Sequence, residues 1–305
     1  MANILRFLAP NSAVTLRPRL ACEILPEGVV AARREGSVED SVLATYAPLA
    51  PGSATAALHT PNLANRQAVV ASLRKALDEV ASRDRHLTLV IPDAAVRVLI
   101  LDFDTLPSKA AEVLPVIRFR LRKLVPFEVE HASISYQVVS AADASLVRVL
   151  VAIMPQDVLA EYESAVSEAG YEPGVVLSSS LAAAAAVSSS EPALVLNRNG
   201  NTVTTVITVA DDILLHRTLE LPAVESEAVS ELQRTVSVAM AYFEDALHTR
   251  PQSLFYAGPG GAPALAPMVE EEGLRVRDLV PAPATGATSA VPKGLLSGVV
   301  GALSN

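Results

Sequence analysis

The chain has 305 residues, of which 50% are hydrophobic and 19% charged, and its formal net charge is −9 at pH 7. This composition excludes a disordered chain, and the negative charge argues against nucleic acid as a partner. The single cysteine excludes an internal disulfide framework and a multi-cysteine metal site. Because the length is about twice that of a typical domain, we expect two domains or one bilobed unit.

The first hundred residues open with a predicted β-hairpin. Its strands, 20–24 and 29–33, flank a Pro-Glu-Gly turn at 26–28. Residues 37–64 are rich in serine, alanine and proline, and we expect exposed loops there. The remaining predicted elements of this part are an amphipathic helix that begins at Asn65 and strands at 87–92 and 96–103.

Residues 100–173 have the predicted order strand, helix, strand, strand, helix, which indicates a small α+β unit inserted in a larger frame. The first helix, 108–124, has Ser108 as its candidate N-cap and Pro115 in its interior, where a kink or a late start is expected. The other predicted elements are strands at 133–140 and 146–153 and a helix at 156–169 that ends at Gly170.

A second, similar pattern begins after residue 190. Because it opens with a hairpin and continues into α/β material, as the first half does, it predicts two related lobes. The predicted elements are strands at 193–196, 202–209 and 213–221, a helix at 226–247, a strand at 253–257, a helix to Glu272 and a strand at 274–276.

We expect a cytoplasmic protein. A bilayer span needs roughly 20 strongly apolar residues, and the uncharged stretch in the middle of the chain, 173–190, is too short and too rich in serine. Residues 1–10 lack the long apolar core and the cleavage site of a signal peptide.

Three groups of motifs, taken in chain order, carry a family resemblance. They are Leu89-Val90-Ile91-Pro92-Asp93 with Leu101-Asp102-Phe103-Asp104-Thr105-Leu106-Pro107, Glu168-Ala169-Gly170-Tyr171 with the alanine-rich stretch 181–187, and Glu231-Leu232-Gln233-Arg234 with Gly258-Pro259-Gly260-Gly261. In this order and spacing they resemble the PilM family of type IV pilus assembly proteins, whose actin-like fold is also that of FtsA. The cytoplasmic domain of the type II secretion protein GspL is a near relative of that family.

The resemblance implies an α/β fold of the actin-like, ribonuclease H-like type, with two lobes and an inserted small α+β subdomain. The implied divisions are a first lobe at 18–99, the inserted subdomain at 100–173, a return to the first lobe at 174–190, a second lobe at 191–280, and a C-terminal segment at 281–305 that returns to the lobes.

The nucleotide motifs depart from the pattern that the resemblance implies. Actin-like ATPases place an Asp-x-Gly on each of two hairpins, where the aspartate positions magnesium and the glycine lets the backbone approach phosphate. The first hairpin here has Glu23, but Leu25 stands where the glycine belongs and would crowd a phosphate. On the second hairpin Asn197 is a poor replacement for a carboxylate, because it carries no charge to hold magnesium.

A glycine turn supplies the third part of a nucleotide site. Gly258, Gly260 and Gly261 match the adenosine-side turn of the family, although a plain strand-to-helix turn has the same sequence features. Any ATP with magnesium would therefore bind at a degenerate site made by these glycines with Glu23 and Asn197. We predict no catalytic residue and, because the five histidines are scattered, no metal site.

The resemblance also implies a partner. PilM proteins bind the short cytoplasmic N-terminal segment of the inner-membrane protein PilN, in a groove between the main lobe and the inserted subdomain, and form a ring-like platform. A homo-oligomer or ring is thus expected, with membrane contact only through partners. The candidate partner-binding residues are Val96, Val98, Ile117, Arg118, Leu121 and Arg122. The arginines belong to a basic cluster at 118–123 that could equally be a solvated helix face.

Two other functions stay open. An actin-fold ATPase or small-molecule kinase would need two phosphate hairpins and an acidic metal site, and the altered positions Leu25 and Asn197 count against it. A GspL-like cytoplasmic domain would continue into a membrane helix, whereas this chain ends at Asn305.

Overall fold

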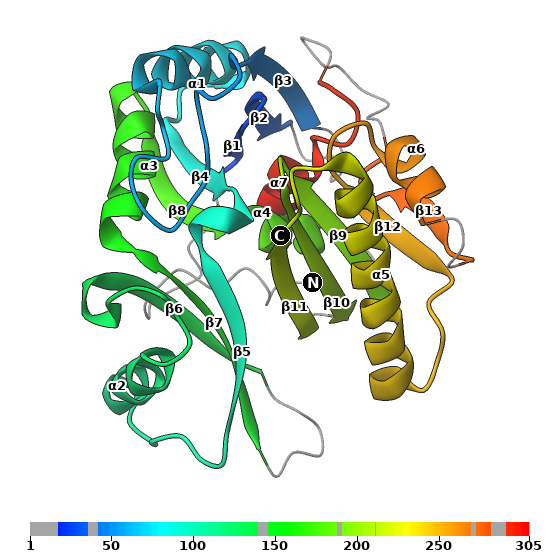
Figure 1. The fold of residues 1–305 in the computed structure, drawn as a ribbon. Helices are drawn as coiled ribbons and strands as arrows, with labels where there is room; N and C mark the ends of the chain where they lie inside the picture. The colour runs from blue at the N-terminus through cyan, green and yellow to red at the C-terminus, as the bar shows by residue number, and fades with distance from the viewer. Residues whose placement is uncertain are drawn as a thin grey trace.

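The computed structural model describes residues 18–35, 42–139, 146–187, 191–210, 212–269, 273–281 and 291–304. Two five-stranded sheets form two lobes, and a three-stranded sheet extends from the first of them (Figure 1).

The sheet of the first lobe has the order β3-β2-β1-β4-β8, with β1 to β3 antiparallel and β4 and β8 parallel to β1. The hairpin predicted from residue 20 is confirmed as β1 and β2. The prediction of loops over 37–64 was wrong in part, because β3 lies there and pairs with β2 along its whole length. The bounds are β1 Leu20–Leu25, β2 Gly28–Arg34, β3 Val42–Pro48, β4 His86–Ile91 and β8 Glu172–Ser178.

The sheet of the second lobe repeats this arrangement, with the order β11-β10-β9-β12-β13 and the same sequence of antiparallel and parallel neighbours. The prediction of two related lobes is thereby confirmed. The first strand continues to Asn199, beyond the predicted end at residue 196, so Asn197 lies within the sheet. The bounds are β9 Ala193–Asn199, β10 Thr202–Val209, β11 Asp212–Glu220, β12 Ser253–Ala257 and β13 Arg275–Asp278.

One long helix covers each lobe. The first begins where predicted, with Asn65 as its N-cap, because the side-chain oxygen of Asn65 accepts a hydrogen bond from Ala68 N at 3.2 Å. The helices of the lobes are α1 Arg66–Val80, α3 Gln156–Glu168, α4 Ser179–Ala185, α5 Glu225–Leu247, α6 Ala262–Leu265 and α7 Ser297–Leu303, with 3₁₀ turns η2 Asp93–Ala95 and η4 Ala266–Met268. No helix in the described ranges has both the length and the apolar character that a membrane crossing requires.

The inserted sheet has the order β5-β7-β6 and is antiparallel throughout. Its helix α2 packs on one face, where Val113, Ile117 and Leu121 meet Val149 and Val151 of the central strand. The N-cap prediction of Ser108 was wrong, since the cap position is Lys109 without a side-chain bond, and the helix runs on through the proline in its interior. The bounds are β5 Arg97–Phe103, α2 Ala110–Leu121, η3 Val129–His131, β6 Ala132–Val139 and β7 Val147–Pro155.

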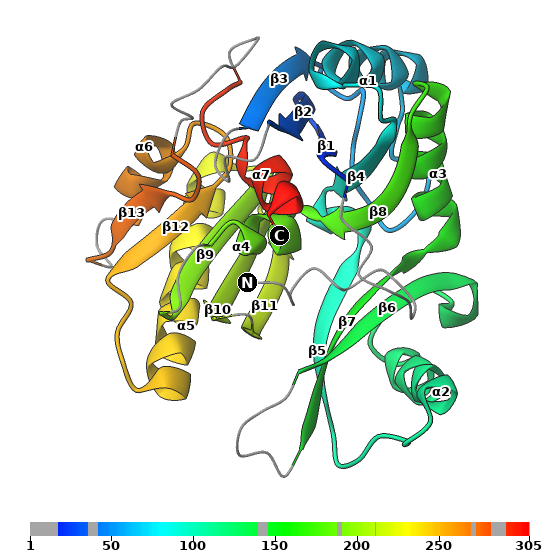
Figure 2. The same ribbon diagram turned by 180° about the vertical axis from the view of Figure 1, so that it is seen from behind.

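Helix α3 joins the inserted sheet to the first lobe. It follows β7 without a loop, and its buried side chains Val158, Tyr162 and Val166 belong to the first-lobe core. The expected boundary at residue 100 falls within β5, and α3 packs beside α1 and β8 (Figure 2). The division of the chain into subdomains stays a prediction.

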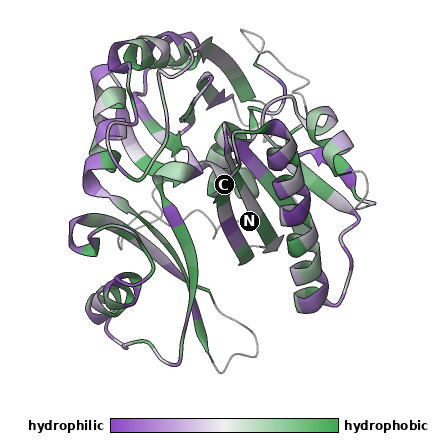
Figure 3. Cartoon of the chain, in the orientation of Figure 1, coloured by the Kyte–Doolittle hydropathy of each residue, from purple (hydrophilic) through white to green (hydrophobic). Residues whose placement is uncertain are grey.

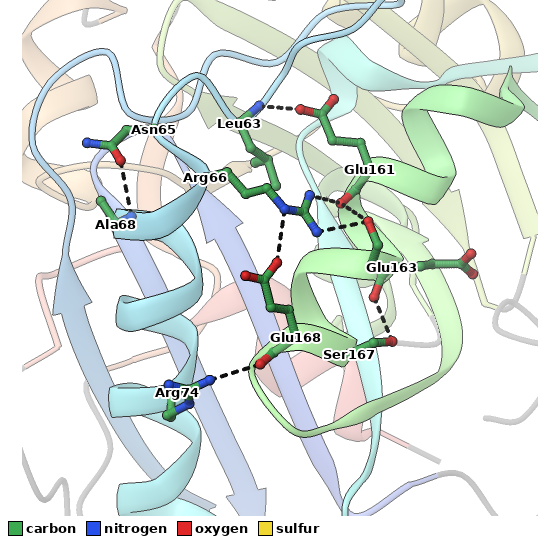
Figure 4. A network of polar contacts seen from close by, with 10 residues as sticks. Leu63, Asn65, Arg66, Ala68, Arg74, Glu161, Glu163, Ser167 and Glu168 are labelled. Carbon is green, nitrogen blue, oxygen red and sulfur yellow. Dashed lines mark hydrogen bonds and ion pairs between the residues drawn. The ribbon is translucent and has the colours of Figure 1, made fainter.

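A polar network links α3 to α1 and to the loop that precedes α1 (Figure 4). The carboxylate of Glu161 accepts hydrogen bonds from the backbone N–H groups of Asn62 and Leu63 at 2.8 and 2.9 Å. Arg66 pairs with Glu168, with 3.0 Å between Nε and Oε2. These contacts fix the position of α3 on the first lobe.

Hydrophobic residues concentrate on the strands, while helices such as α1 and α3 alternate between apolar and polar positions (Figure 3). The C-terminal helix α7 packs on α4, β1 and β4 of the first lobe. Its Gly301 lies directly against the backbone of Ala182, a contact that leaves no room for a side chain. The end of the chain therefore closes the first lobe on the side that faces the second.

Candidate functional site

The two lobes meet at a cluster of buried polar side chains around Asp93, in η2. Asp93 Oδ1 accepts hydrogen bonds from the backbone N–H and the hydroxyl of Ser180, in the first lobe, at 3.0 and 2.7 Å. Its Oδ2 accepts from Asn197 Nδ2 at 3.0 Å and from Thr204 Oγ1 at 2.8 Å, both in the second lobe. Since Asp93 is only 2% exposed, these bonds replace the water that the carboxylate loses on folding. The carboxylate thus links the lobes.

The predicted nucleotide residue Glu23 lies beside this cluster, within β1. It is buried, and its Oε1 accepts a hydrogen bond from Ser179 Oγ at 2.6 Å. Gly298 of α7 packs against the other carboxylate oxygen so closely that a β-carbon there would overlap it. Removal from water raises the pKa of Glu23 to about 8, in spite of the hydrogen bond from Ser179. A carboxyl group that is protonated at neutral pH is a weak ligand for magnesium.

Asn197, the second predicted nucleotide residue, is directed into the same cluster. Besides its bond to Asp93, its Nδ2 lies 3.1 Å from Ser179 Oγ and 3.3 Å from Asn199 Oδ1. The amide nitrogen of Asn197 is therefore already bonded within the protein.

His216 of β11 completes the cluster on the second-lobe side. Its Nε2 lies 2.8 Å from Ser180 Oγ, and its Nδ1 has no hydrogen-bond partner within the described ranges. Removal from water lowers the pKa of His216 to about 4, and the opposing effect of the Asp93 charge is smaller. The ring is therefore neutral at neutral pH, and its contact with Ser180 is a second polar link between the lobes.

The predicted adenosine-side turn is covered by the chain's own C-terminal segment. Gly258 N donates a hydrogen bond to Gly294 O at 3.0 Å, and Gly294 adopts a φ of +86° in direct contact with Gly258. Gly261 also has a positive φ, +64°, and packs against Lys293. The backbone of this turn is thus paired with protein atoms, at the place where the resemblance puts adenosine.

Little room remains in this interlobe cleft. Glu23, Asn197 and Gly258 line one cavity of about 10 Å³, roughly the space of a single water molecule. Gly260 and Gly261 belong to the same turn but do not line the cavity. Three of the five predicted nucleotide residues therefore meet at a cavity that is far smaller than a nucleotide.

A far larger cavity lies between the inserted sheet and the first lobe. Its volume is about 770 Å³, and α2, β6, β7, α3 and β8 all contribute to its walls. The side chains that line it are mainly apolar and include Leu114, Ile134, Met154, Val176 and Leu181. We call this cavity the groove; its walls are the elements at the left of Figure 1.

Two edge strands border the groove. β6 is the last strand of the inserted sheet and β8 the last strand of the first-lobe sheet, and no other described strand pairs with their outer edges. The consecutive residues 133–136 of β6 and 174–178 of β8 line the groove. Because successive side chains of a strand point to opposite faces, lining by consecutive residues indicates that the groove faces the backbone edges. Unpaired strand edges are places where an extended segment can add by main-chain hydrogen bonds.

Glu163 of α3 is the single charged residue among those that line the groove. Its carboxylate makes no ion pair or hydrogen bond with any described residue, and in Figure 4 it points away from the network around Arg66. Partial removal from water raises the pKa of Glu163. The groove is thus an apolar channel with one unmatched carboxylate.

The predicted partner-binding residues fall in several places. Val96 lines the groove. Val98 is buried in the core between the inserted sheet and the first lobe, and Ile117 and Leu121 are fully buried beneath α2. These three side chains cannot reach a partner without repacking of a core.

The two predicted arginines lie outside the groove lining. Arg122 forms an ion pair with Glu130, with 2.6 Å between the charged atoms, and Arg118 donates to the backbone oxygen of the same residue at 3.4 Å. Whether Arg118 and Arg122 contact a partner stays a prediction.

Sequence reasoning missed the cluster of Asp93, Ser180 and His216. Ser178, two residues before Ser180, is the N-cap of α4. A usable signal was present: Asp93 and Ser180 follow the ends of two strands that prove to be parallel neighbours, whose carboxyl ends meet at one sheet edge. Glu163 gave no signal, because a glutamate in an amphipathic helix is ordinarily solvated.

The duplicated five-stranded sheets with a cleft between them define the class of protein: the chain has an actin-like fold. A solved PilM–PilN type IV pilus biogenesis complex is similar, with a TM-score of 0.72 and 16% identity over 94% of this chain and 98% of that one. The resemblance inferred from the motifs is confirmed at the level of fold.

Two further structures are similar over most of their length. The cytoplasmic domain of EpsL, an inner-membrane component of the type II secretion system of Vibrio cholerae, matches with a TM-score of 0.53 and 12% identity over 94% of both chains. The ethanolamine utilization protein EutJ from Carboxydothermus hydrogenoformans matches with a TM-score of 0.50 and 10% identity over 98% of this chain and 93% of that one. No family model matches the sequence, and no curated protein matches it by sequence.

Proposed function

We propose that this protein is an actin-like scaffold of a type IV pilus assembly machine and binds the cytoplasmic N-terminal segment of an inner-membrane partner similar to PilN. The observation that carries the proposal is the groove: about 770 Å³, mainly apolar and bordered by two unpaired strand edges. Such a groove suits a short extended segment, which gains affinity from main-chain pairing and specificity from side-chain pockets. The similarity to a PilM–PilN complex supports the same reading.

The interlobe cleft supports a scaffold rather than an enzyme. Phosphoryl transfer needs metal ions and donors arranged around the phosphates, whereas the polar groups here are bonded to one another and Glu23 is protonated at neutral pH. The protein would then reach the membrane through its partner, and assembly into a homo-oligomer or ring is part of this proposal.

The test is partner binding to the groove. The full chain is purified from native membranes, the co-purifying protein is identified, and its N-terminal segment is titrated as a peptide. Leu114→Asp places a charge among the apolar side chains of the groove and should weaken binding at least about tenfold. The matched control is Phe119→Asp on the same helix, since Phe119 is 71% exposed and lies outside the groove lining. Equal affinities for the two variants would remove the groove from the proposal.

The enzyme alternative predicts a different result. If magnesium and ATP bind in the cleft, a ligand concentration of 100 times the dissociation constant stabilises the fold by about 2.7 kcal/mol. A thermal-shift titration with magnesium–ATP measures this directly, and we expect an unchanged melting temperature. The similarity to the EpsL cytoplasmic domain supports a scaffold of a secretion system as the second candidate, which the identity of the co-purifying protein distinguishes from the pilus reading.

A further inference from the structure

We propose that Glu163 makes the groove selective for an apolar segment that carries one basic side chain, which the Glu163 carboxylate pairs with when the segment is bound. This inference rests on the proposed function, because it names the chemistry of the segment that occupies the same groove.

The first argument for the proposal is the position of Glu163 at the groove wall. Its neighbours along α3 point elsewhere: Tyr162 is buried in the first-lobe core, and Ser164 is part of the network with Arg66. Glu163 takes part in that network through its backbone oxygen, which accepts a hydrogen bond from Ser167 Oγ at 3.0 Å. Its carboxylate is not involved in this bond. The carboxylate is therefore held at the groove wall by a helix that is itself fixed to α1.

The second argument is the partial removal of the Glu163 carboxylate from water. Partial burial raises the pKa of Glu163, and the described residues supply no cation or hydrogen-bond donor to offset the loss of hydration. A charge that is partly desolvated without a partner is unfavourable, and an incoming guanidinium or ammonium group removes that cost on binding. An acidic side chain at the same place would meet like charge in a medium less polar than water, so the groove also excludes acidic segments.

The third argument is that the strand edges determine the conformation of the bound segment. A segment that pairs with β6 or β8 is extended, and its side chains alternate between two directions. The apolar lining on both sides, with Ile134 on β6 and Val176 on β8, then requires apolar residues next to the basic one. The expected pattern is one arginine or lysine flanked by apolar side chains within about four to six residues.

The experiment uses the full chain and, as its probe, a phage-displayed library of random 12-residue peptides. We expect selected peptides to carry arginine or lysine at one position between apolar residues. Glu163→Gln should weaken their binding about tenfold, and Glu163→Lys more strongly, with selection on the lysine variant shifting to aspartate or glutamate. Glu112→Gln on α2 is the matched control, since Glu112 pairs with Lys109 outside the groove lining and should leave binding unchanged.

Leu114→Asp distinguishes a failure of the charge selection by Glu163 from a failure of the proposed function of the groove. If peptides lose binding to Leu114→Asp but show no basic position, or bind Glu163→Gln with full affinity, the charge selection is wrong and the groove remains the binding site. If no peptide is selected, or the selected peptides ignore Leu114→Asp, the proposed function fails together with this inference. Melting curves of each variant show that changes in affinity do not arise from unfolding.

Discussion

The interlobe cleft and the groove are two concave regions of the molecule that differ in how their polar groups are bonded. In the cleft, which holds a cavity of about 10 Å³, Asp93 accepts hydrogen bonds from Ser180 of its own lobe and from Asn197 of the other lobe. In the groove of about 770 Å³, Glu163 has no described partner and the strand edges are unpaired. Polar groups satisfied by the protein leave little for a ligand to add, whereas unsatisfied groups offer binding energy. The comparison indicates that the groove, rather than the cleft between the lobes, has polar groups available to a ligand.

The largest effect is expected from Asp93→Ala, which tests whether the polar cluster holds the lobes together. It removes the buried carboxylate that accepts hydrogen bonds from Ser180 N, Asn197 Nδ2 and Thr204 Oγ1, so we expect the free energy of unfolding to fall by about 3 kcal/mol. Denaturant unfolding monitored by circular dichroism measures the change.

Asp104→Ala is the control for that experiment, because Asp104 is exposed at the end of the inserted sheet. Its effect should stay within about 0.5 kcal/mol. An equally small effect of Asp93→Ala would mean that the polar cluster does not hold the lobes together.

A smaller change is expected from Glu23→Gln, and it depends on pH. The pKa of Glu23 is raised on folding from 4.5 to about 8, so the folded chain keeps a proton that the unfolded chain releases. The stability of the wild type therefore falls as pH rises through this window, by up to about 1.4 kcal/mol per pH unit. Glutamine does not ionise, so the variant should gain relative to the wild type by on the order of 2 kcal/mol between pH 5 and pH 7. Melting temperatures across this range measure it, and parallel curves would contradict the buried, protonated state.

The ionisation of His216 changes stability with pH in the opposite direction, between about pH 4 and pH 6.5. Its pKa is lowered on folding from 6.5 to about 4, so the unfolded chain binds the proton first and stability falls as pH decreases from 6.5 to 4. His216→Gln should flatten the acid side of the stability profile and leave the alkaline side unchanged. An unchanged acid side would show that the ring is open to water.

The smallest effect is expected from the double change Arg118→Glu with Arg122→Glu. Both residues lie outside the groove lining, so they act on a bound segment only over a distance, and their bonds to Glu130 are exposed and weak. For a basic segment we expect binding to strengthen about twofold to threefold at low salt, because two repulsive charges are replaced by attractive ones. Weakened binding in a titration would instead support the direct partner role predicted from the sequence.

Local patterns predicted the elements that local physics determines. The turn at 26–28 and the start and amphipathic character of α1 depend on residues close in sequence, and they were predicted. β3 was missed because alanine and proline are weak strand formers, and it forms through pairing with β2. The predicted nucleotide residues Glu23 and Asn197 do meet, but the sequence could not show that Ser179 and α7 fill the space between them.

The candidate site was the harder part to predict. Asp93 and His216 are joined through Ser180 from elements far apart in the chain, and no spacing rule connects them. Glu163 differs from an ordinary surface glutamate because strands β6 and β7 of the inserted sheet line the same groove. Both facts belong to the tertiary arrangement, which residue patterns along one helix or strand do not contain.

The direct junction of β7 and α3 has a mechanical consequence. Pro155 ends the strand and Gln156 begins the helix, so no slack linker separates the inserted sheet from the helix that Glu161 and Arg66 bind to the first lobe. A pull on a segment held along β6 would pass through β7 into α3 and be borne by the first-lobe core. The load would thus be carried by packed side chains and short hydrogen bonds rather than by a flexible linker.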